Sequence, residues 1–139
     1  MAWRGCAALL VLAMAGGPAL ADDVVFFRTP SDNIHCGLIA GGGGLADCEI
    51  AEMSVRSPLP PRPADCDLDY GNRFQLEGAG PAIMGCYGDT VRTPDARVLA
   101  YGREIRVGQI TCRSDSSGLT CRNGSGYGFF LSKGSQELF

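Results

Sequence analysis

Short apolar runs, interrupted by turn residues, cover the chain from Val24 onward. Gly, Pro, Asn and Asp separate these runs at intervals of roughly eight to twelve residues, the spacing of strands in all-β domains. No window of about 11 residues in this part repeats apolar side chains with the period of a helix. The expected strands cover residues 24–27, 34–39, 46–50, 74–76, 82–84, 98–101, 103–107, 109–113 and 129–131. The pattern predicts an all-β fold, either a small antiparallel sandwich or an irregular barrel of hairpins.

The first 21 residues have the organisation of a secretory signal peptide. Arg4 supplies a positive start, residues 7–15 are apolar, and a small-x-small cleavage site ends at Ala21. Cys6 precedes the apolar stretch, whereas a lipid-anchored cysteine would follow it. No later segment has the about 20 continuous apolar residues of a membrane span. We expect cleavage after Ala21, no membrane insertion afterwards, and one domain over residues 22–139 in the periplasm or outside the cell.

Six cysteines remain after this cleavage. An even number in an exported chain indicates three disulfides, although the sequence alone does not choose among the possible pairings. Proximity along the chain favours the pairs Cys36–Cys48, Cys66–Cys86 and Cys112–Cys121. Zinc binding is not favoured, because the chain has no C-x-x-C pair and only one histidine, His35. We expect no cofactor.

The charge balance narrows the class of partner. The chain carries a net charge of −3, which becomes −4 when Arg4 leaves with the signal peptide. Nucleic-acid binding needs a dense basic surface, so this class is excluded. We expect a monomer whose partner is a protein or a glycan.

Asp65, Asp67 and Asp69 alternate along the chain, with Gly71 and Glu77 further on. Calcium sites use oxygen ligands at alternating positions, a glycine for the turn and a later carboxylate. The spacing here is one residue longer before the glycine than in an EF-hand loop, and no flanking helices are evident. We therefore favour a solvated acidic turn, with calcium as the alternative. His35 is expected to be an exposed strand histidine that points away from the Cys36 disulfide.

The stretch from residue 110 to 132 is expected to form a disulfide-clipped hairpin, a tight turn at Asn123-Gly124 and a further strand. Alternation along that strand places Tyr127 and Phe129 on one face and Phe130 on the other. We expect Phe129 or Phe130 to pack in the core. The outward face, with Arg122 and Tyr127, is the candidate binding surface.

Several short motifs carry a family resemblance. They are F-x-T-P-S-x-N-I-x-C at residues 27–36, C-x-G-D-T at 86–90, L-x-Y-G at 99–102, G-x-T-C-x-N at 118–123 and G-x-G-F-x-L-S at 126–132. Together they resemble a family of small exported bacterial domains of unknown function. The resemblance implies an extracytoplasmic compartment and disulfides, and it brings no activity or catalytic residue.

These observations favour a non-enzymatic binding or interaction module. No nucleophile motif or paired carboxylates accompany His35, so a catalytic site is not predicted. One alternative is a small extracytoplasmic hydrolase, or a calcium-dependent module that uses residues 65–69. Another is a protease inhibitor, with residues 58–63 or 41–44 as the exposed loop.

Overall fold

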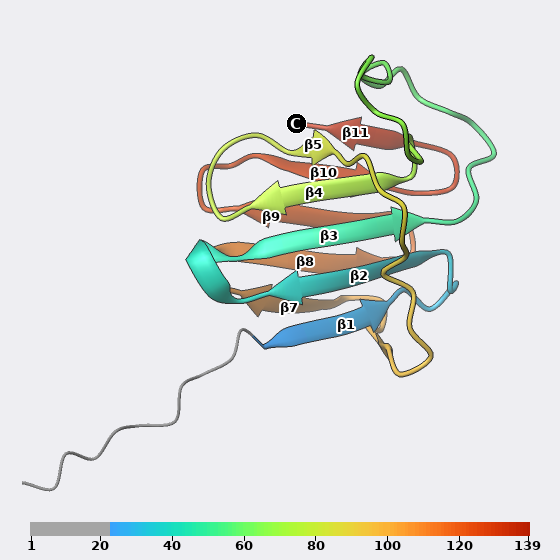
Figure 1. Cartoon of the computed structure of the whole chain (residues 1–139). Helices are drawn as coiled ribbons and strands as arrows, with labels where there is room; N and C mark the ends of the chain where they lie inside the picture. Colours follow the sequence, from blue (N-terminus) through green and yellow to red (C-terminus); the bar gives the residue numbers. More distant parts are fainter. Residues whose placement is uncertain (1–22) are drawn as a thin grey trace, which may run out of the picture.

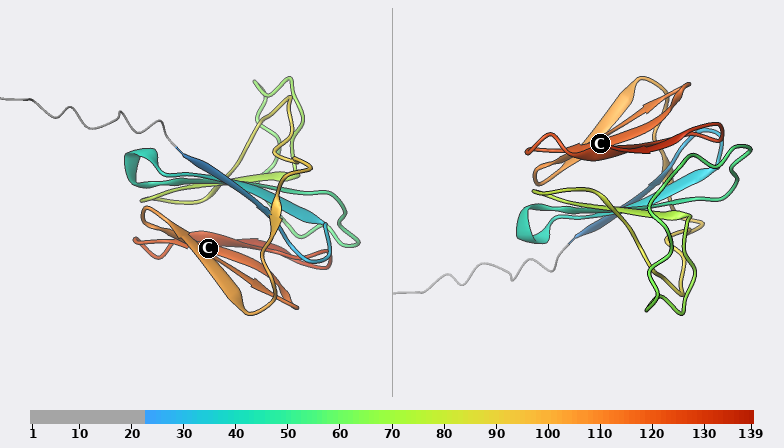
Figure 2. Two further views of the ribbon diagram at one scale, coloured as in Figure 1. Left: turned by 90° about the horizontal axis from the view of Figure 1, so that it is seen from below. Right: turned by 90° about the horizontal axis from the view of Figure 1, so that it is seen from above.

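A computed structural model describes residues 23–139, which form two β-sheets packed face to face (Figures 1 and 2). The first sheet has the order β5-β4-β3-β2-β1-β6 and the second the order β11-β10-β9-β8-β7. The strands are β1 (Val24–Arg28), β2 (Ile34–Ile39), β3 (Leu45–Ile50), β4 (Arg73–Glu77), β5 (Ile83–Met84), β6 (Arg97–Val98), β7 (Arg103–Val107), β8 (Ile110–Asp115), β9 (Gly118–Asn123), β10 (Gly128–Leu131) and β11 (Gln136–Leu138). The all-β prediction is confirmed, and the architecture is a sandwich rather than a closed barrel. The predicted signal peptide lies outside the described residues.

One apolar core fills the space between the sheets. Alternation places the core residues, because Ala46, Cys48 and Ile50 of β3 are buried while the residues between them are partly exposed. The rings of Phe74 on β4 and Phe129 on β10 have centroids 5.9 Å apart and join the two sheets. Phe129 is thus the core aromatic of the last strands. Within residues 23–139, no helix is long and apolar enough to cross a membrane.

The disulfides follow the predicted local pairs. Cys36 lies directly opposite Cys48 in the β2–β3 register, and Cys112 lies opposite Cys121 in the β8–β9 register. All four of these cysteines are fully buried, so each of these two disulfides staples one hairpin from its core side. The third disulfide, Cys66–Cys86, instead ties the irregular segment of residues 51–72 to the chain that follows β5.

Residues 85–96, which we call the crossover, run from one edge of the first sheet to the other. They connect β5 to β6, and they lie across the outer face of the sheet (Figure 1). The Thr90 hydroxyl donates a hydrogen bond to Glu49 Oε2 at 2.7 Å, and Arg92 Nη2 donates to the Asp32 carbonyl at 3.3 Å. Polar residues of the outer face therefore become enclosed.

Two local expectations differ from the structure. His35 was expected to be exposed, but it lies beneath the crossover and is only 4% exposed. The strand expected over residues 98–101 is shorter. Only β6 forms, parallel to β1, because the chain then turns toward the second sheet, with Arg103 N donating to the Ala100 carbonyl.

The glycine-rich tip after β2 packs on the second sheet. Gly108 has φ +56°, and a Cβ there would meet the Gly43 carbonyl, so both strain and contact require glycine.

Candidate functional site

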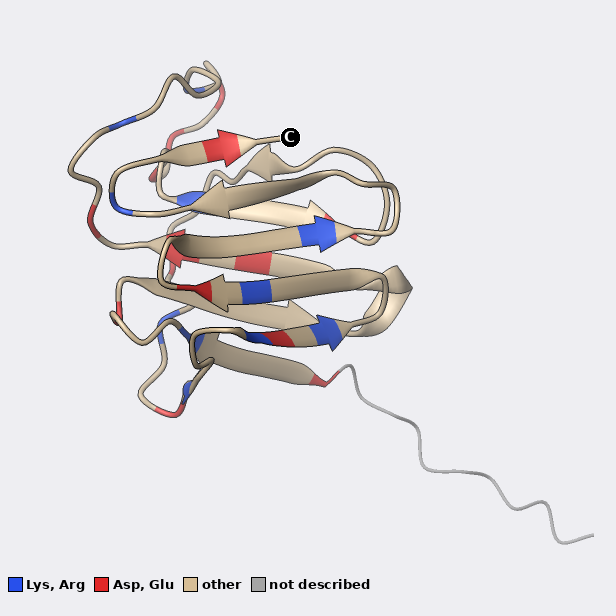
Figure 3. Ribbon diagram, turned by 180° about the vertical axis from the view of Figure 1, so that it is seen from behind, with Lys and Arg blue, Asp and Glu red and all other residues tan. Residues whose placement is uncertain are grey.

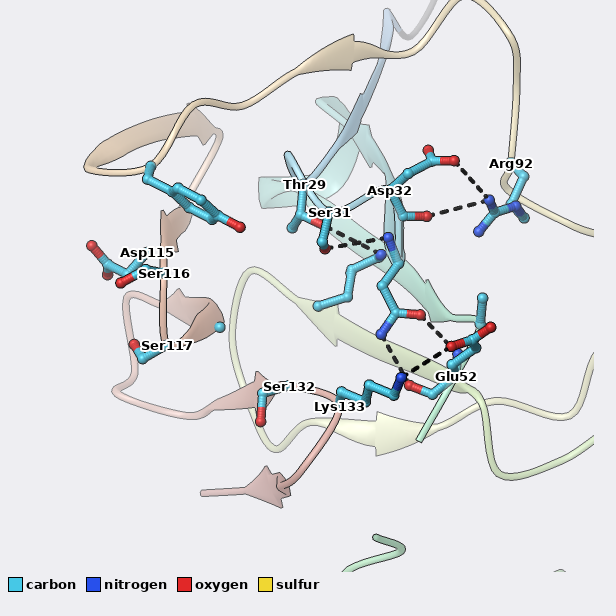
Figure 4. Close-up of a pocket in the computed structure, with 15 residues that line it drawn as sticks. Thr29, Ser31, Asp32, Glu52, Arg92, Asp115, Ser116, Ser117, Ser132 and Lys133 are labelled. Carbon is cyan, nitrogen blue, oxygen red and sulfur yellow. Dashed lines mark hydrogen bonds and ion pairs between the residues drawn. The ribbon is translucent and has the colours of Figure 1, made fainter. Parts of the chain in front are cut away.

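At one end of the sandwich, turns of both sheets surround a cleft of about 520 Å³ (Figure 4). The β1–β2 turn borders the cleft from the first sheet. The β8–β9 turn and the residues after β10 border it from the second sheet. Arg92 of the crossover and Tyr101 of the β6–β7 connection complete the lining. We refer to this space simply as the cleft.

Hydrogen bonds within the β1–β2 turn, and from it to the segment after β3, hold the turn in place. The Asp32 amide donates to the Thr29 carbonyl at 2.9 Å, and Asp32 has φ +62°, a left-handed conformation that aspartate tolerates. The Asn33 side chain donates to the Glu52 carbonyl at 2.9 Å and accepts from the Glu52 amide at 2.8 Å. These bonds tie the turn to the segment after β3. Ser31 and Asp32 are therefore held on a rigid turn at the cleft.

Each carboxylate at the cleft contacts a cation. The pairs are Asp32 Oδ2 with Arg92 Nη2 at 3.5 Å, Glu52 Oε2 with Lys133 Nζ at 3.2 Å, and Asp115 Oδ2 with Arg113 Nε at 3.1 Å. A hydrogen bond from His35 Nε2 to Asp32 Oδ1 at 2.7 Å is the main cause that lowers the pKa of Asp32 below its usual value. Arg28 and Arg92 lower it further. Asp32 is therefore an anion at neutral pH.

The remaining lining of the cleft is neutral. It includes the hydroxyl side chains of Ser31, Ser116, Ser117 and Ser132. The ring of Tyr101 is 51% exposed. A half-exposed aromatic ring beside several hydroxyl groups offers both a stacking surface and hydrogen bonds to a small polar ligand.

A second concavity of about 390 Å³, which we call the hollow, adjoins the cleft. It is lined by Arg28, Asp32, His35, Arg92, Thr93 and Pro94. Asp32 and Arg92 line both spaces, so the hollow continues the cleft onto the outer face of the first sheet. Two buried atoms on its lining residues, His35 Nδ1 and Arg92 Nη1, have no hydrogen-bond partner.

A further charged group lies under the crossover. Arg73 pairs with Asp47, with Nη2 2.8 Å from Oδ2, and its guanidinium carbon lies 4.8 Å from the ring centroid of Tyr87. The hydrogen bond to Asp47 is the main cause that raises the pKa of Arg73. Arg73 Nη1 also donates to the Asp89 carbonyl at 3.3 Å. This group anchors the crossover to the sheet and opens onto neither the cleft nor the hollow.

The acidic stretch lies apart from these two spaces. Asp65, Asp67 and Asp69 are exposed, and Asp69 pairs through its backbone with Tyr87. Glu77 ends β4, and its carbonyl accepts a hydrogen bond from Asn123 Nδ2. Among residues 23–139, no three His, Cys, Asp or Glu side chains gather in a group that could hold a metal ion. The four residues of the alternative calcium site are thus not brought together.

Arg122 and Tyr127 also lie outside the cleft. Arg122 belongs to the outer face of the second sheet, where charges of both signs alternate (Figure 3). Its guanidinium carbon lies 5.0 Å from the ring centroid of Phe139. Tyr127 is 42% exposed in the β9–β10 turn, at the end of the sandwich opposite the cleft. Both remain candidates for a separate contact surface.

Neither proposed inhibitor loop borders the cleft. Residues 58–63 have no regular secondary structure and run over the surface. Arg62 Nε donates to the Cys66 carbonyl at 2.9 Å and closes this segment on itself. The glycine tip is covered in part, because Gln109 N donates to the Gly43 carbonyl at 2.8 Å.

Two open sheets, three disulfides and a cleft between the turns define a small disulfide-linked β-sandwich domain. The chain belongs to the family of unknown function DUF6636, whose family model matches residues 7–139. Comparisons with curated proteins and with solved structures find no match. The motifs that carry the resemblance include several residues of the cleft, namely Thr29, Ser31, Asn33, Tyr101, Gly118 and Ser132.

Sequence reasoning missed the cleft. Its lining comes from separate turns that carry no shared motif, and only the fold of two sheets brings them to the same end. Besides the family motifs that contain some of its residues, the available signal was the concentration of small hydroxyl residues in the turns at residues 29–33 and 115–118. Such residues are ordinary in turns, so the signal does not separate a site from a connection.

Proposed function

We propose that this protein is an exported, non-enzymatic binding module whose cleft takes a hydroxyl-rich ligand, a saccharide unit. The observation that carries the proposal is that the half-exposed Tyr101 lies in one cleft with several hydroxyl groups and ion-paired charges. Its volume of about 520 Å³ falls within the range of small-molecule sites.

The chemistry of a sugar matches this lining in two ways. The apolar C–H face of a pyranose packs on an aromatic ring, while its hydroxyl groups each offer one donor and two acceptor positions. Carboxylates such as Glu52 accept from these hydroxyls, and cations such as Lys133 donate to them. Because Glu52 and Lys133 are already paired at 3.2 Å, they are held in place before the ligand arrives.

A binding role is favoured over hydrolysis by the bonds of the candidate catalytic groups. The Ser31 hydroxyl bonds Thr29 Oγ1 at 3.1 Å, and His35 Nε2 bonds Asp32, so no serine is bonded to the imidazole. A nucleophile and its base need such a contact. Asp32, an anion bonded to His35, is also unsuited to act as a general acid.

Export is part of the proposal. Three disulfides in a small domain are compatible with an extracytoplasmic location, where oxidised cysteines persist. Removal of residues 1–21 as a signal peptide would deliver the chain to that compartment. There a binding module would meet saccharides of the cell surface or of the medium.

The test is a titration of the oxidised protein, expressed as the full chain, with a panel of neutral monosaccharides and oligosaccharides. We expect ¹H–¹⁵N resonances of Ser31, Asn33 and Tyr101 to shift. Tyr101→Ala should weaken binding roughly tenfold, since an aromatic contact contributes about 1 kcal/mol or more beyond its buried area.

Tyr127→Ala is the matched control, because Tyr127 is similarly exposed but lies at the opposite end of the sandwich. Its affinity should equal that of the wild type. The proposal is wrong if no member of the panel binds, or if both tyrosine variants lose the same affinity.

A further inference from the structure

We propose that the hollow is an anion subsite, and that the ligand of the cleft is an acidic saccharide whose carboxylate enters between Arg28 and Arg92. This inference rests on the proposed function of the cleft and specifies the class of ligand. The two spaces share Asp32 and Arg92, which are labelled among the cleft residues in Figure 4, so one ligand can occupy both spaces at once.

The hollow carries an excess of positive charge. Among the described residues that line it, Asp32 is the only carboxylate, and it faces two guanidinium groups, with Arg28 Nη1 at 3.4 Å from Oδ1 and Arg92 Nη2 at 3.5 Å from Oδ2. Both arginine side chains are 34% exposed and so remain accessible to a ligand. The hollow therefore has a local charge of +1 even when His35 is neutral.

The two arginines also have donors to spare. A guanidinium group has five N–H donors. Within the described residues, the side chain of Arg28 donates only to Asp32, and that of Arg92 donates only to the Asp32 carbonyl while its Nη2 pairs with the carboxylate. A carboxylate accepts two parallel bonds from one guanidinium, which is the geometry that these free donors offer.

Two enclosed atoms of the hollow lack the partners that buried polar groups normally have. Arg92 Nη1 is a donor with no acceptor. His35 is 4% exposed, its Nε2 is bonded to Asp32, and its Nδ1 has no hydrogen-bond partner. Both atoms are closed to solvent, so a ligand carboxylate would bind the exposed donors of Arg28 and Arg92 rather than these two atoms.

The charge of the cleft limits the ligand to one acidic group at one end. Asp32, Glu52 and Asp115 of the cleft are each already paired with a cation, so no unpaired cation among its described lining residues is available to a second negative group. A polyanion such as a nucleic acid is disfavoured for the same reason. The arrangement fits a saccharide with a neutral unit on Tyr101 and a uronate at the hollow.

The test compares pairs of probes that differ only at one carbon. Methyl glucuronide and methyl galacturonide are titrated into the oxidised full-chain protein beside methyl glucoside and methyl galactoside, by calorimetry at low salt. We expect at least one uronide to bind about tenfold tighter than its neutral parent, the size of one charge-assisted hydrogen bond. The advantage should shrink as salt is added.

Substitutions of single residues test whether the preference for the uronide arises in the hollow. Arg28→Gln should reduce uronide affinity to that of the neutral parent and leave binding of the neutral parent unchanged, because Arg28 lines the hollow and not the cleft. Arg92→Gln should reduce uronide affinity more than it reduces that of the neutral parent, because Arg92 lines both spaces. Tyr101→Ala should weaken both probes. Arg106→Gln, which removes an exposed guanidinium from β7 of the second sheet, should change neither. The ¹H–¹⁵N spectrum of each variant verifies that the fold is retained.

The outcomes separate this inference from the proposed function. Equal binding of uronide and parent would overturn the anion subsite and leave the saccharide cleft in place. Binding of neither would overturn both. Glucose 6-phosphate and glucose 6-sulfate form further arms, and a uniform preference for them over the uronides would overturn the assignment to a carboxylate. If inorganic sulfate binds as tightly as the uronide, the hollow is an adventitious ion site only, and the proposal is overturned.

Discussion

Arg73 is the buried cation that compensates the acidic side chains on the outer face of the first sheet. Its side chain is 5% exposed, it donates to both oxygens of Asp47, and its Nη1 lies 3.9 Å from Glu49 Oε2. The side chains of Asp47 and Glu49 are themselves only 16% and 14% exposed. Such a buried ion pair adds little net stability over an apolar contact. Removal of one partner is nevertheless strongly destabilising, because it leaves the other charge buried and unpaired.

We therefore expect Arg73→Met to lower the free energy of unfolding by about 3–5 kcal/mol, because it leaves two enclosed carboxylates without a cation. Urea unfolding at neutral pH measures the change. Arg113→Met is the matched control, since its pair with Asp115 is 50% and 39% exposed and should contribute about 1 kcal/mol or less. Equal losses in the two variants would contradict this account of Arg73.

The Asp32 carboxylate contributes to the stability of the folded protein, and this contribution is lost in acid. The hydrogen bond from His35 holds the folded pKa of Asp32 below its ordinary value of 3.8. A lowered folded pKa contributes stability that is complete above the unfolded pKa and is lost as the pH falls through the folded pKa.

Asp32→Asn should accordingly be less stable than the wild type at neutral pH, and this difference should shrink as the pH falls below 3.8. Asparagine also tolerates the left-handed conformation of this position, so the substitution tests the charge rather than the backbone. Urea unfolding between about pH 7 and pH 2 gives the curve. A difference that widened toward acid would show that the carboxylate has the opposite effect.

At the scale of elements, the hairpins are what the sequence predicts best. The alternating pattern of residues 45–50 and the turn residues around it place β2 and β3 almost at their observed bounds, and the cysteines then fix the register. The crossover was not predictable, because residues 85–96 show only turn chemistry and their place depends on contacts with distant strands. His35 was misjudged for this reason, since a polar residue on an outer face is exposed unless another segment covers it.

The Cys66–Cys86 disulfide should be the first to be reduced. Cys86 is exposed, whereas the four cysteines of the two hairpin disulfides are fully buried, and a thiolate must reach a sulfur atom to attack it. Brief treatment with dilute dithiothreitol, alkylation and peptide mass spectrometry identify the order. We expect labels on Cys66 and Cys86 while the hairpin pairs remain intact.

The species reduced at this one disulfide should keep the sandwich and lose protection locally. Hydrogen exchange should rise in residues 51–72 and in the crossover, which this disulfide connects, and stay low in β2, β3, β8 and β9. A Cys66→Ser/Cys86→Ser variant should reproduce the pattern. Simultaneous loss of all three disulfides would mean that the crossover and the core open as one unit.

Across the whole molecule, the sheets are joined by one core and a few polar contacts. Asn123 of the second sheet donates from Nδ2 to the carbonyls of Glu77 and Gly80 at 3.0 and 2.8 Å. Gln136, which is 1% exposed, donates to the Val55 carbonyl at 3.1 Å. The Asn123 contacts join the sheets at the end opposite the cleft, and Gln136 joins them near the segment after β10. Because the lining of the cleft comes from both sheets, the cleft should exist only when both are folded.

Complete reduction should unfold the protein near 37 °C. The disulfides close loops with separations of 12, 20 and 9 residues, and loop-closure entropy gives each roughly 3 kcal/mol, or about 9 kcal/mol together. A typical domain has a net stability of only about 5–15 kcal/mol.

Because two disulfides are buried, reduction and alkylation are carried out in denaturant, which is then removed. An oxidised sample taken through the same steps is the control. Far-UV circular dichroism should show a melting transition for the control and none above 37 °C for the reduced protein. Coincident melting curves would mean that the apolar core alone holds the two sheets, and with them the cleft, in place.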